Sequence, residues 1–334
     1  ESSSGYVLKT PDQTKYVFSS AGDIQYFEDK LGNRLNVTVD SEHRITALGD
    51  AIGTSVSFAY TGGLLTTVTD VRSNRTVSYA YNAGGYLTAA TNFGGRTTTY
   101  GYDASGKMSW IKDNLGRTVQ SVTYVTDTAG GNAGKVHTVT DEPGLVSTYE
   151  YHPELGEVVV TDSGGRQTVQ RYDNAGNVTE VENAEGMKTT TEYLLTNGQN
   201  RFGEVRAKSD MYGNITTYVR DSRGNVIKTT YPDGSTEQKT YDEYNNVIRS
   251  VDRVGAVTYY VYDAEGKHLL KAAKPLDGRS VYREEADESK FAVTAYTYYP
   301  DEAYGRKGLV RTETGPLGDS ENYTKYEYNT RGNL

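Results

Sequence analysis

A fixed period of 21 residues is the feature that most constrains what this chain can fold into. An anchor residue, usually aromatic, returns at that spacing at Phe18, Val39, Tyr60, Tyr81 and Tyr102. Later anchors continue the series, in chain order: Tyr124, Tyr151, Tyr172, Tyr193, Arg220, Tyr241, Tyr262, Tyr299 and Tyr328. Two longer steps, which begin at Tyr124 and Tyr193, are explained by longer loops after those anchors. A period that survives insertions predicts a repeated structural unit.

Glycine marks two turns in every period. The first turn has its glycine four residues after the anchor, at Gly22, Gly85, Gly106, Gly176, Gly224, Gly266 and Gly332. The second has it fourteen residues after the anchor, at Gly32, Gly53, Gly95, Gly116, Gly165, Gly186, Gly234 and Gly255. Glycine supplies the positive φ that tight hairpin turns require. The runs between turns alternate with period two and are rich in Thr, Val and Tyr, which predicts strands. We therefore expect an all-β fold of tandem antiparallel hairpins.

The anchors are expected to lie on one face of the sheet. An aromatic residue often stands two positions before the anchor, as in Tyr79 and Tyr81 or Tyr100 and Tyr102, and residues i and i+2 of a strand share a face. Successive hairpins would then stack these rings into a structural ladder. The predicted ladder comprises Phe18, Tyr60, Tyr81, Tyr102, Tyr124, Tyr151, Tyr172, Tyr193, Tyr241, Tyr262, Tyr299 and Tyr328.

Composition supports a sheet with little deep core. Hydrophobic residues make up 35% of the chain, below the roughly 45–50% usual for globular proteins, while tyrosine is abundant with 30 residues. The net charge of −9 is mild and its two signs are interspersed, so no basic stripe predicts nucleic-acid binding. No apolar run is long enough to insert in a membrane. The chain has no cysteine, which excludes disulfides, thiol catalysis and cysteine–zinc sites.

Few residues have the pattern of a chemical site. The histidines, His43, His137, His152 and His268, do not pair at metal-ligand spacing. The glycine-rich run 130–134 lacks the helix and the Lys-Ser/Thr pair of a phosphate loop and is interpreted as a loop insertion. Residues 276–290 are a second expected loop insertion, with a partner-binding arm as the alternative. We expect no catalytic residue, no cofactor and no metal.

The anchor turns resemble the YD repeat of RHS proteins. The segments that carry the resemblance are Tyr172-Asp173-Asn174-Ala175-Gly176-Asn177-Val178, Tyr102-Asp103-Ala104-Ser105-Gly106-Lys107-Met108 and Tyr262-Asp263-Ala264-Glu265-Gly266-Lys267. The resemblance covers nearly the whole chain. It implies a β-sheet wound spirally into an open shell, as in bacterial RHS and wall-associated polymorphic toxins, Tc-toxin shells and teneurins. The family's self-cleavage motif contains Asp-Pro, which never occurs here, so self-cleavage is not implied.

The resemblance implies a structural role. We expect residues 1–334 to be a single RHS/YD array, a fragment truncated within a repeat near Leu334, from a secreted or cell-surface bacterial protein. Its function would be that of a non-catalytic scaffold, part of a cage that encloses or delivers a C-terminal toxin. Its partners would be the rest of the polypeptide shell and the enclosed toxin domain. The alternative is an adhesin whose repeats bind a cell-surface glycan.

Overall fold

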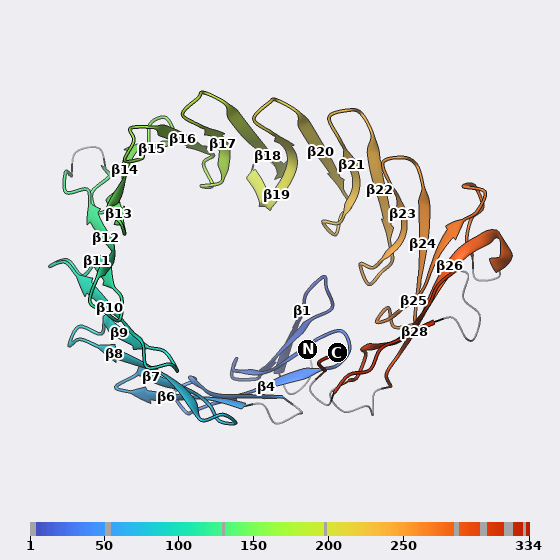
Figure 1. The fold of residues 1–334 in the computed structure, drawn as a ribbon, viewed down its shortest axis with the longest axis horizontal. Helices are drawn as coiled ribbons and strands as arrows, with labels where there is room; N and C mark the ends of the chain where they lie inside the picture. The colour runs from blue at the N-terminus through green and yellow to red at the C-terminus, as the bar shows by residue number, and fades with distance from the viewer. Residues whose placement is uncertain are drawn as a thin grey trace. The chain divides into compact units, whose positions relative to one another are not determined.

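The computed structural model describes residues 5–50, 55–128, 131–196, 199–283, 287–300, 306–316, 323–329 and 332–334, with the backbone alone for 195–196 and 199–202. Gly53, Gly130 and residues 284–286 lie outside the described residues. The chain divides into two compact units, one formed by Phe58–Thr217 and the other by Glu1–Ser57 together with Tyr218–Leu334. In both units the strands follow one another along the chain and are joined by turns (Figure 1).

The unit of Phe58–Thr217 is a run of antiparallel hairpins in which each strand from β7 to β20 pairs with the next. Its strands are β7 (Leu64–Asp70), β8 (Arg75–Tyr81), β9 (Leu87–Thr91), β10 (Thr97–Tyr102), β11 (Met108–Lys112), β12 (Thr118–Tyr124), β13 (Val136–Asp141), β14 (Leu145–His152), β15 (Glu157–Thr161), β16 (Gln167–Tyr172), β17 (Val178–Glu182), β18 (Lys188–Thr196), β19 (Gln199–Ser209) and the first residues of β20 (Ile215–Arg220).

The other unit combines hairpins from both ends of the chain. Consecutive strands pair antiparallel from β1 to β6 and again from β21 to β28. These strands are β1 (Gly5–Lys9), β2 (Lys15–Ser19), β3 (Ile24–Glu28), β4 (Arg34–Val39), β5 (Ile45–Asp50), β6 (Ser55–Thr61), β21 (Val226–Thr230), β22 (Thr236–Tyr241), β23 (Val247–Val251), β24 (Val257–Tyr262), β25 (Leu269–Pro275), β26 (Phe291–Tyr298), β27 (Val310–Thr314) and β28 (Tyr323–Lys325).

The expected all-β fold of antiparallel hairpins is confirmed. Among the described residues the one helical element is the 3₁₀ turn η2 (Glu288–Lys290). It lies in the segment 276–290, which connects the paired strands β25 and β26, and the Leu276 N–H donates to the Lys290 carbonyl at its base. A loop of this kind adds length without breaking the pairing of the hairpin below it.

A β-bulge recurs directly before the anchor. The register shifts between Gly101 and Tyr102, and the same shift occurs before Tyr81 and Tyr172. Bulges add one residue to one strand and increase the local twist. The anchor then stands opposite the first residue of the next strand, as Tyr172 does opposite Val178. The bulge therefore gives successive anchors the same orientation at their turns.

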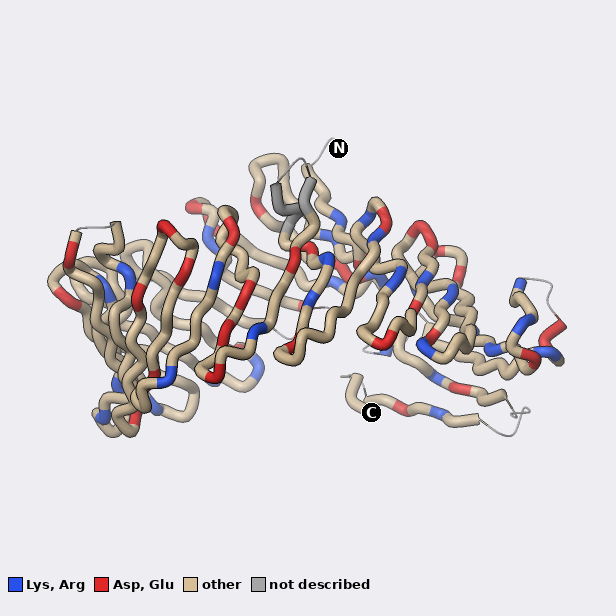
Figure 2. The backbone as a smooth tube through the Cα atoms, turned by 90° about the horizontal axis from the view of Figure 1, so that it is seen from above, with Lys and Arg blue, Asp and Glu red and all other residues tan. Residues whose placement is uncertain are grey.

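Little of the chain is deeply buried. Among the described residues, the side chains below a tenth exposed are those of Val159, Ala273, Phe291 and Glu28, apart from glycine. A sheet with no second layer over it leaves most side chains half-exposed, which suits tyrosine because the ring packs while the hydroxyl keeps a polar partner. Acidic and basic residues are interspersed along the backbone (Figure 2). Stability must therefore come mainly from contacts between neighbouring strands.

Candidate functional site

The anchor tyrosines connect each hairpin to the one before it. The Tyr102 hydroxyl donates to the backbone carbonyl oxygen of Leu87 at 2.7 Å, and Leu87 is the residue paired with the previous anchor, Tyr81. Tyr124 does the same to Met108, the partner of Tyr102. We call this hydroxyl-to-carbonyl contact the tyrosine clamp. It satisfies a polar group of the ring with an acceptor in the preceding repeat.

The clamp recurs in both units with the same phase. The described clamps are Tyr81 to Leu65 (2.7 Å), Tyr102 to Leu87 (2.7 Å), Tyr124 to Met108 (2.7 Å), Tyr193 to Val178 (3.0 Å), Tyr241 to Val226 (3.0 Å) and Tyr298 to Leu269 (2.7 Å). Each acceptor is the first or second residue of a strand. Because the acceptor is a backbone atom, the clamp requires the tyrosine but no particular residue as its partner.

Lysines from the preceding repeat cover two of the anchor rings. The Lys107 Nζ lies 5.0 Å from the centre of the Tyr124 ring, and the Lys135 Nζ lies 4.8 Å from that of Tyr151. Each lysine follows the first turn of the hairpin before the anchor that it covers. A cation over an aromatic face is favourable by about 0.5–1 kcal/mol at exposed sites. These two anchors therefore use a ring face, as well as a hydroxyl or an edge, to contact the preceding repeat.

Tyr298, not Tyr299, stands at the register of the other anchors. The bulge falls between Thr297 and Tyr298, and Tyr298 makes the clamp. The Tyr299 N–H instead donates to the Leu309 carbonyl, the bond that Asp173 makes in its own turn. Tyr299 therefore occupies the place of the aspartate in the Tyr-Asp pair. The sequence gives adjacent tyrosines here, and only the position of the bulge distinguishes them.

The other expected ladder residues are placed in varied contacts. The rings of Tyr299 and Tyr328 meet edge to face with centres 6.0 Å apart. The Tyr172 hydroxyl donates to the Gln170 side chain at 2.6 Å. Burial raises the pKa of Tyr262 above its ordinary value, so its hydroxyl remains protonated further into the alkaline range. Phe18 and Tyr60 lie on β2 and β6 and are half-buried. A continuous ring-on-ring ladder stays a prediction.

The expected turn glycines adopt the left-handed conformation wherever they are described. Positive φ is found at Gly22, Gly32, Gly85, Gly95, Gly106, Gly116, Gly165, Gly176, Gly186, Gly224, Gly234, Gly255, Gly266 and Gly332. Aspartate or asparagine three residues earlier accepts two backbone N–H groups in many of these turns. Asp173, for example, accepts from Ala175 and Asn177 through Oδ1. The turn is thus built from a glycine and a side-chain cap together.

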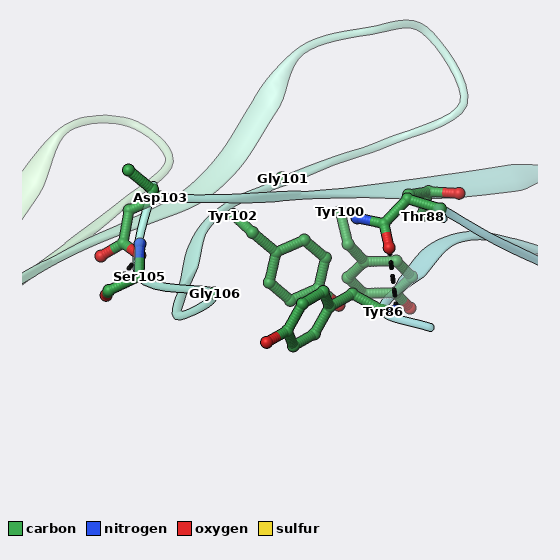
Figure 3. Close-up of a pocket in the computed structure, with 10 residues that line it drawn as sticks. Tyr86, Thr88, Tyr100, Gly101, Tyr102, Asp103, Ser105 and Gly106 are labelled. Atoms are coloured by element: carbon green, nitrogen blue, oxygen red, sulfur yellow. Dashed lines mark hydrogen bonds between the residues drawn. The ribbon is translucent and has the colours of Figure 1, made fainter. Parts of the chain in front are cut away.

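A cleft of about 410 Å³ lies beside two of these turns in the unit of Phe58–Thr217. The rings of Tyr86, Tyr100 and Tyr102 lie on the same side of β10 and line it (Figure 3). The Tyr86 and Tyr102 rings are tilted against each other, with centres 5.1 Å apart. Gly101 lies between two of these tyrosines, and a side chain there would collide with the Trp110 indole on the other face. The cleft offers aromatic faces and turn amides but no paired acid and base.

The histidines are placed in separate repeats. His43 Nδ1 lies 2.6 Å from an Asp23 carboxylate oxygen, and His268 Nδ1 lies 2.7 Å from one of Asp263. In the described parts of the chain, no three His, Asp or Glu side chains gather as a metal site would require. Likewise, no helix within the described ranges has the length and hydropathy of a membrane span.

Comparison with known proteins gives one curated relative and several structures. No family model matches the chain. The double-stranded DNA deaminase toxin A of Burkholderia cenocepacia (strain H111) is 27% identical over 175 residues, which cover 51% of this chain and 11% of that protein. The chain therefore spans about a tenth of the length of the curated relative.

The similar structures are of Tc toxins. A Photorhabdus luminescens Tc holotoxin pore with a substituted TccC3 has a TM-score of 0.58 at 14% identity, over 96% of this chain and 19% of that one. A TcdB2-TccC3 crystal structure has a TM-score of 0.55 at 14% identity, over 97% of this chain and 20% of that one. At this identity the likeness establishes the fold. By its repeated Tyr-Asp-x-x-Gly turns and by this fold, the chain is an RHS/YD-repeat protein.

Proposed function

We propose that the chain is a non-catalytic scaffold, part of an RHS/YD cage that encloses or delivers a toxin carried by the same polypeptide. The observation that carries the proposal is the likeness of fold to Tc-toxin structures over 96% of the chain. The curated relative is itself a toxin and is about nine times longer than the matched region, which leaves room for a cargo domain. The partners would be the rest of the shell and that cargo.

The recurrent clamp supports the scaffold role. A shell wall must keep its curvature against thermal fluctuation, and an array whose repeats touch only their neighbours derives its stiffness from each interface. The clamp supplies one directional bond per interface from a ring that is already half-buried. The sheet therefore needs no second layer to hold adjacent hairpins in register. We place the protein outside the cytoplasm, secreted or on a bacterial surface, in keeping with the Tc-toxin likeness.

Protease protection of the whole polypeptide tests the cage. The full-length protein that contains this chain is treated with protease, and survival of the segment beyond the repeats is followed by mass spectrometry. We expect this segment to be cut much more slowly within the full-length protein than when it is expressed alone. Equal rates of cleavage would contradict enclosure.

The tyrosine-lined cleft favours a second candidate, a glycan-binding surface. Sugars stack on aromatic faces, and Tyr86 and Tyr100 present such faces beside exposed turn amides. A glycan array with the chain and with its Tyr86→Ala variant distinguishes the two functions. Binding by the original chain that the variant loses would support the adhesin, and no binding by either would favour the scaffold.

A further inference from the structure

In the unit of Glu1–Ser57 and Tyr218–Leu334, turns from the two ends of the chain lie against each other. The Gln13 Nε2 donates to the Tyr244 carbonyl at 3.1 Å, across 231 residues of sequence. The Asn245 Nδ2 donates in return to the Pro11 carbonyl at 2.9 Å. The turn between β1 and β2 is therefore tied to the turn between β22 and β23 by two reciprocal side-chain bonds.

Both donors have an unfavourable backbone conformation. Gln13 has φ 71° and Asn245 has φ 64°, in the left-handed region that other turns of this chain assign to glycine. Four described residues other than glycine have positive φ, and two of them meet at this contact. A side chain in that region costs free energy unless the surrounding structure compensates for it. Here the compensation is the bond that only a side chain can make.

Neighbouring side chains fix the direction of the Asn245 amide. The Asn225 Nδ2 donates to the Asn245 Oδ1 at 2.8 Å, so the Nδ2 of Asn245 faces Pro11. Gln13 and Asn245 are both half-buried, whereas the glycines at the same turn position in Gly176 and Gly186 are exposed. The contact thus has a defined geometry and excludes part of the solvent.

A second pair of turns extends the contact. A Cβ placed on Gly308 would lie 2.6 Å from Leu31 Cδ1, so the turn after β3 fills the space above the turn after β26. Near Gly32, the Lys307 Nζ would lie 3.1 Å from such a Cβ. The turns at 10–13 and 29–32 therefore face those at 242–245 and 306–308. These four turns form what we call the seam.

We infer that Gln13 and Asn245 are an interlock that holds the first hairpin onto the β22–β23 turn and couples the two ends of this unit. In an array stabilised only between neighbours, an end hairpin would open alone. The interlock instead makes opening of β1–β2 depend on a turn 231 residues away. The interlock does not depend on the cage proposal.

Glycine substitution gives a test in which the two readings have opposite signs. Replacing a left-handed residue by glycine relieves backbone strain and ordinarily stabilises a turn. Asn74, at φ 52° in the other unit, is the matched control. We expect Asn74→Gly to leave the melting temperature unchanged or raised. Asn245→Gly and Gln13→Gly should each lower the protection of β1 and β2 amides from hydrogen exchange.

The double variant should show the loss most clearly. Removing both bonds should increase exchange in β1 and β2 about tenfold, because a net hydrogen bond contributes about 0.5–1.5 kcal/mol. Exchange in β7–β19 should not change. Asn245→Asp is the conservative check, because it keeps an acceptor for Asn225 but presents a carboxylate oxygen to the Pro11 carbonyl. It should behave like Asn245→Gly.

A distance measurement distinguishes opening from local softening. The chain has no cysteine, so spin labels can be placed at Lys9→Cys and Glu243→Cys, which line the cleft beside the interlock. We expect one narrow distance distribution, which becomes broader and longer when Gln13→Gly and Asn245→Gly are added. A distribution that stays narrow, together with unchanged exchange in β1 and β2, would overturn the interlock.

Discussion

The Tyr102 hydroxyl lies 2.7 Å from the carbonyl oxygen of Leu87, the residue that faces Tyr81 across the preceding hairpin. One anchor thereby reaches the strand that begins opposite the anchor before it. The same relationship between anchor and preceding strand is found at Tyr124 and Tyr193. A single side-chain type, placed once per repeat, therefore carries part of the cohesion between hairpins.

Removing only the hydroxyl isolates the clamp. Tyr102→Phe keeps the ring and leaves the Leu87 carbonyl without its side-chain donor, which should cost about 1 kcal/mol. Urea unfolding followed by circular dichroism measures this loss. Tyr100→Phe is the control, since Tyr100 lies on the same strand and its hydroxyl makes no described hydrogen bond. Equal losses in the two variants would show that the clamp contributes nothing specific.

Valine at the turn glycines should be costly for a reason of backbone conformation alone. Gly176 and Gly186 have φ 82° and 76°, and a Cβ at either position would meet nothing within 4 Å. Gly176→Val or Gly186→Val therefore introduces strain without a clash, about 1–3 kcal/mol. Thr189→Val, on β18, should change stability little, because valine is favourable in strands. Thermal melts in which all three variants lose the same amount would contradict the two-turn repeat.

The phase of the repeat was readable from the sequence because the anchor, the aspartate and the turn glycine recur together. The first and second turns occur where the glycines predict them, as Gly176 and Gly186 illustrate. The bulge before the anchor was not predicted, since a one-residue shift leaves no mark on the alternation of the strand. For that reason the anchor of the last full hairpin was placed at Tyr299, one residue beyond Tyr298.

The contacts between hairpins were harder to predict than the hairpins. The clamp ends on a backbone carbonyl, so the residue at Leu87 carries no sequence signal for it. The pairing of Gln13 with Asn245 spans 231 residues and requires the fold of the unit to be known first. A trace was nevertheless present. Asn245 and Gln13 both stand where the repeat has glycine, and such a substitution indicates a side chain with work to do.

Acid should weaken the first hairpins through Glu28. This largely buried carboxylate lies between Lys15 Nζ and Arg34 Nε, each 2.6 Å away. The hydrogen bond from Lys15, with that from Arg34, holds the pKa of Glu28 below its ordinary value of 4.5. Because the pKa is lower in the folded state, the stabilisation is complete above about pH 4.5 and is lost as the pH falls through the lowered pKa.

Glu28→Gln should therefore be less stable than the original chain at pH 7, and the difference should shrink below pH 4.5. Melting temperatures measured from pH 7 to pH 3 test this. Glu42→Gln is the control, because Glu42 is exposed and its pairing with Arg44 is screened by solvent. A difference between Glu28→Gln and the original chain that is constant with pH would remove Glu28 from the acid response.

The last prediction separates a ladder of rings from a series of clamps. If the anchors stack, Tyr81 has neighbours on both sides, and Tyr81→Ala should cost about 3 kcal/mol, the lower end for a large aromatic because Tyr81 is only half-buried. Tyr328→Ala should cost less, since its described ring contact is with Tyr299 on one side. Tyr81→Phe removes only the hydroxyl bond to Leu65 and, in a ladder, should keep most of the stability. Urea unfolding of the three variants gives the comparison. If Tyr81→Phe loses as much as Tyr81→Ala, the clamp alone carries the contact and the rings do not form a ladder.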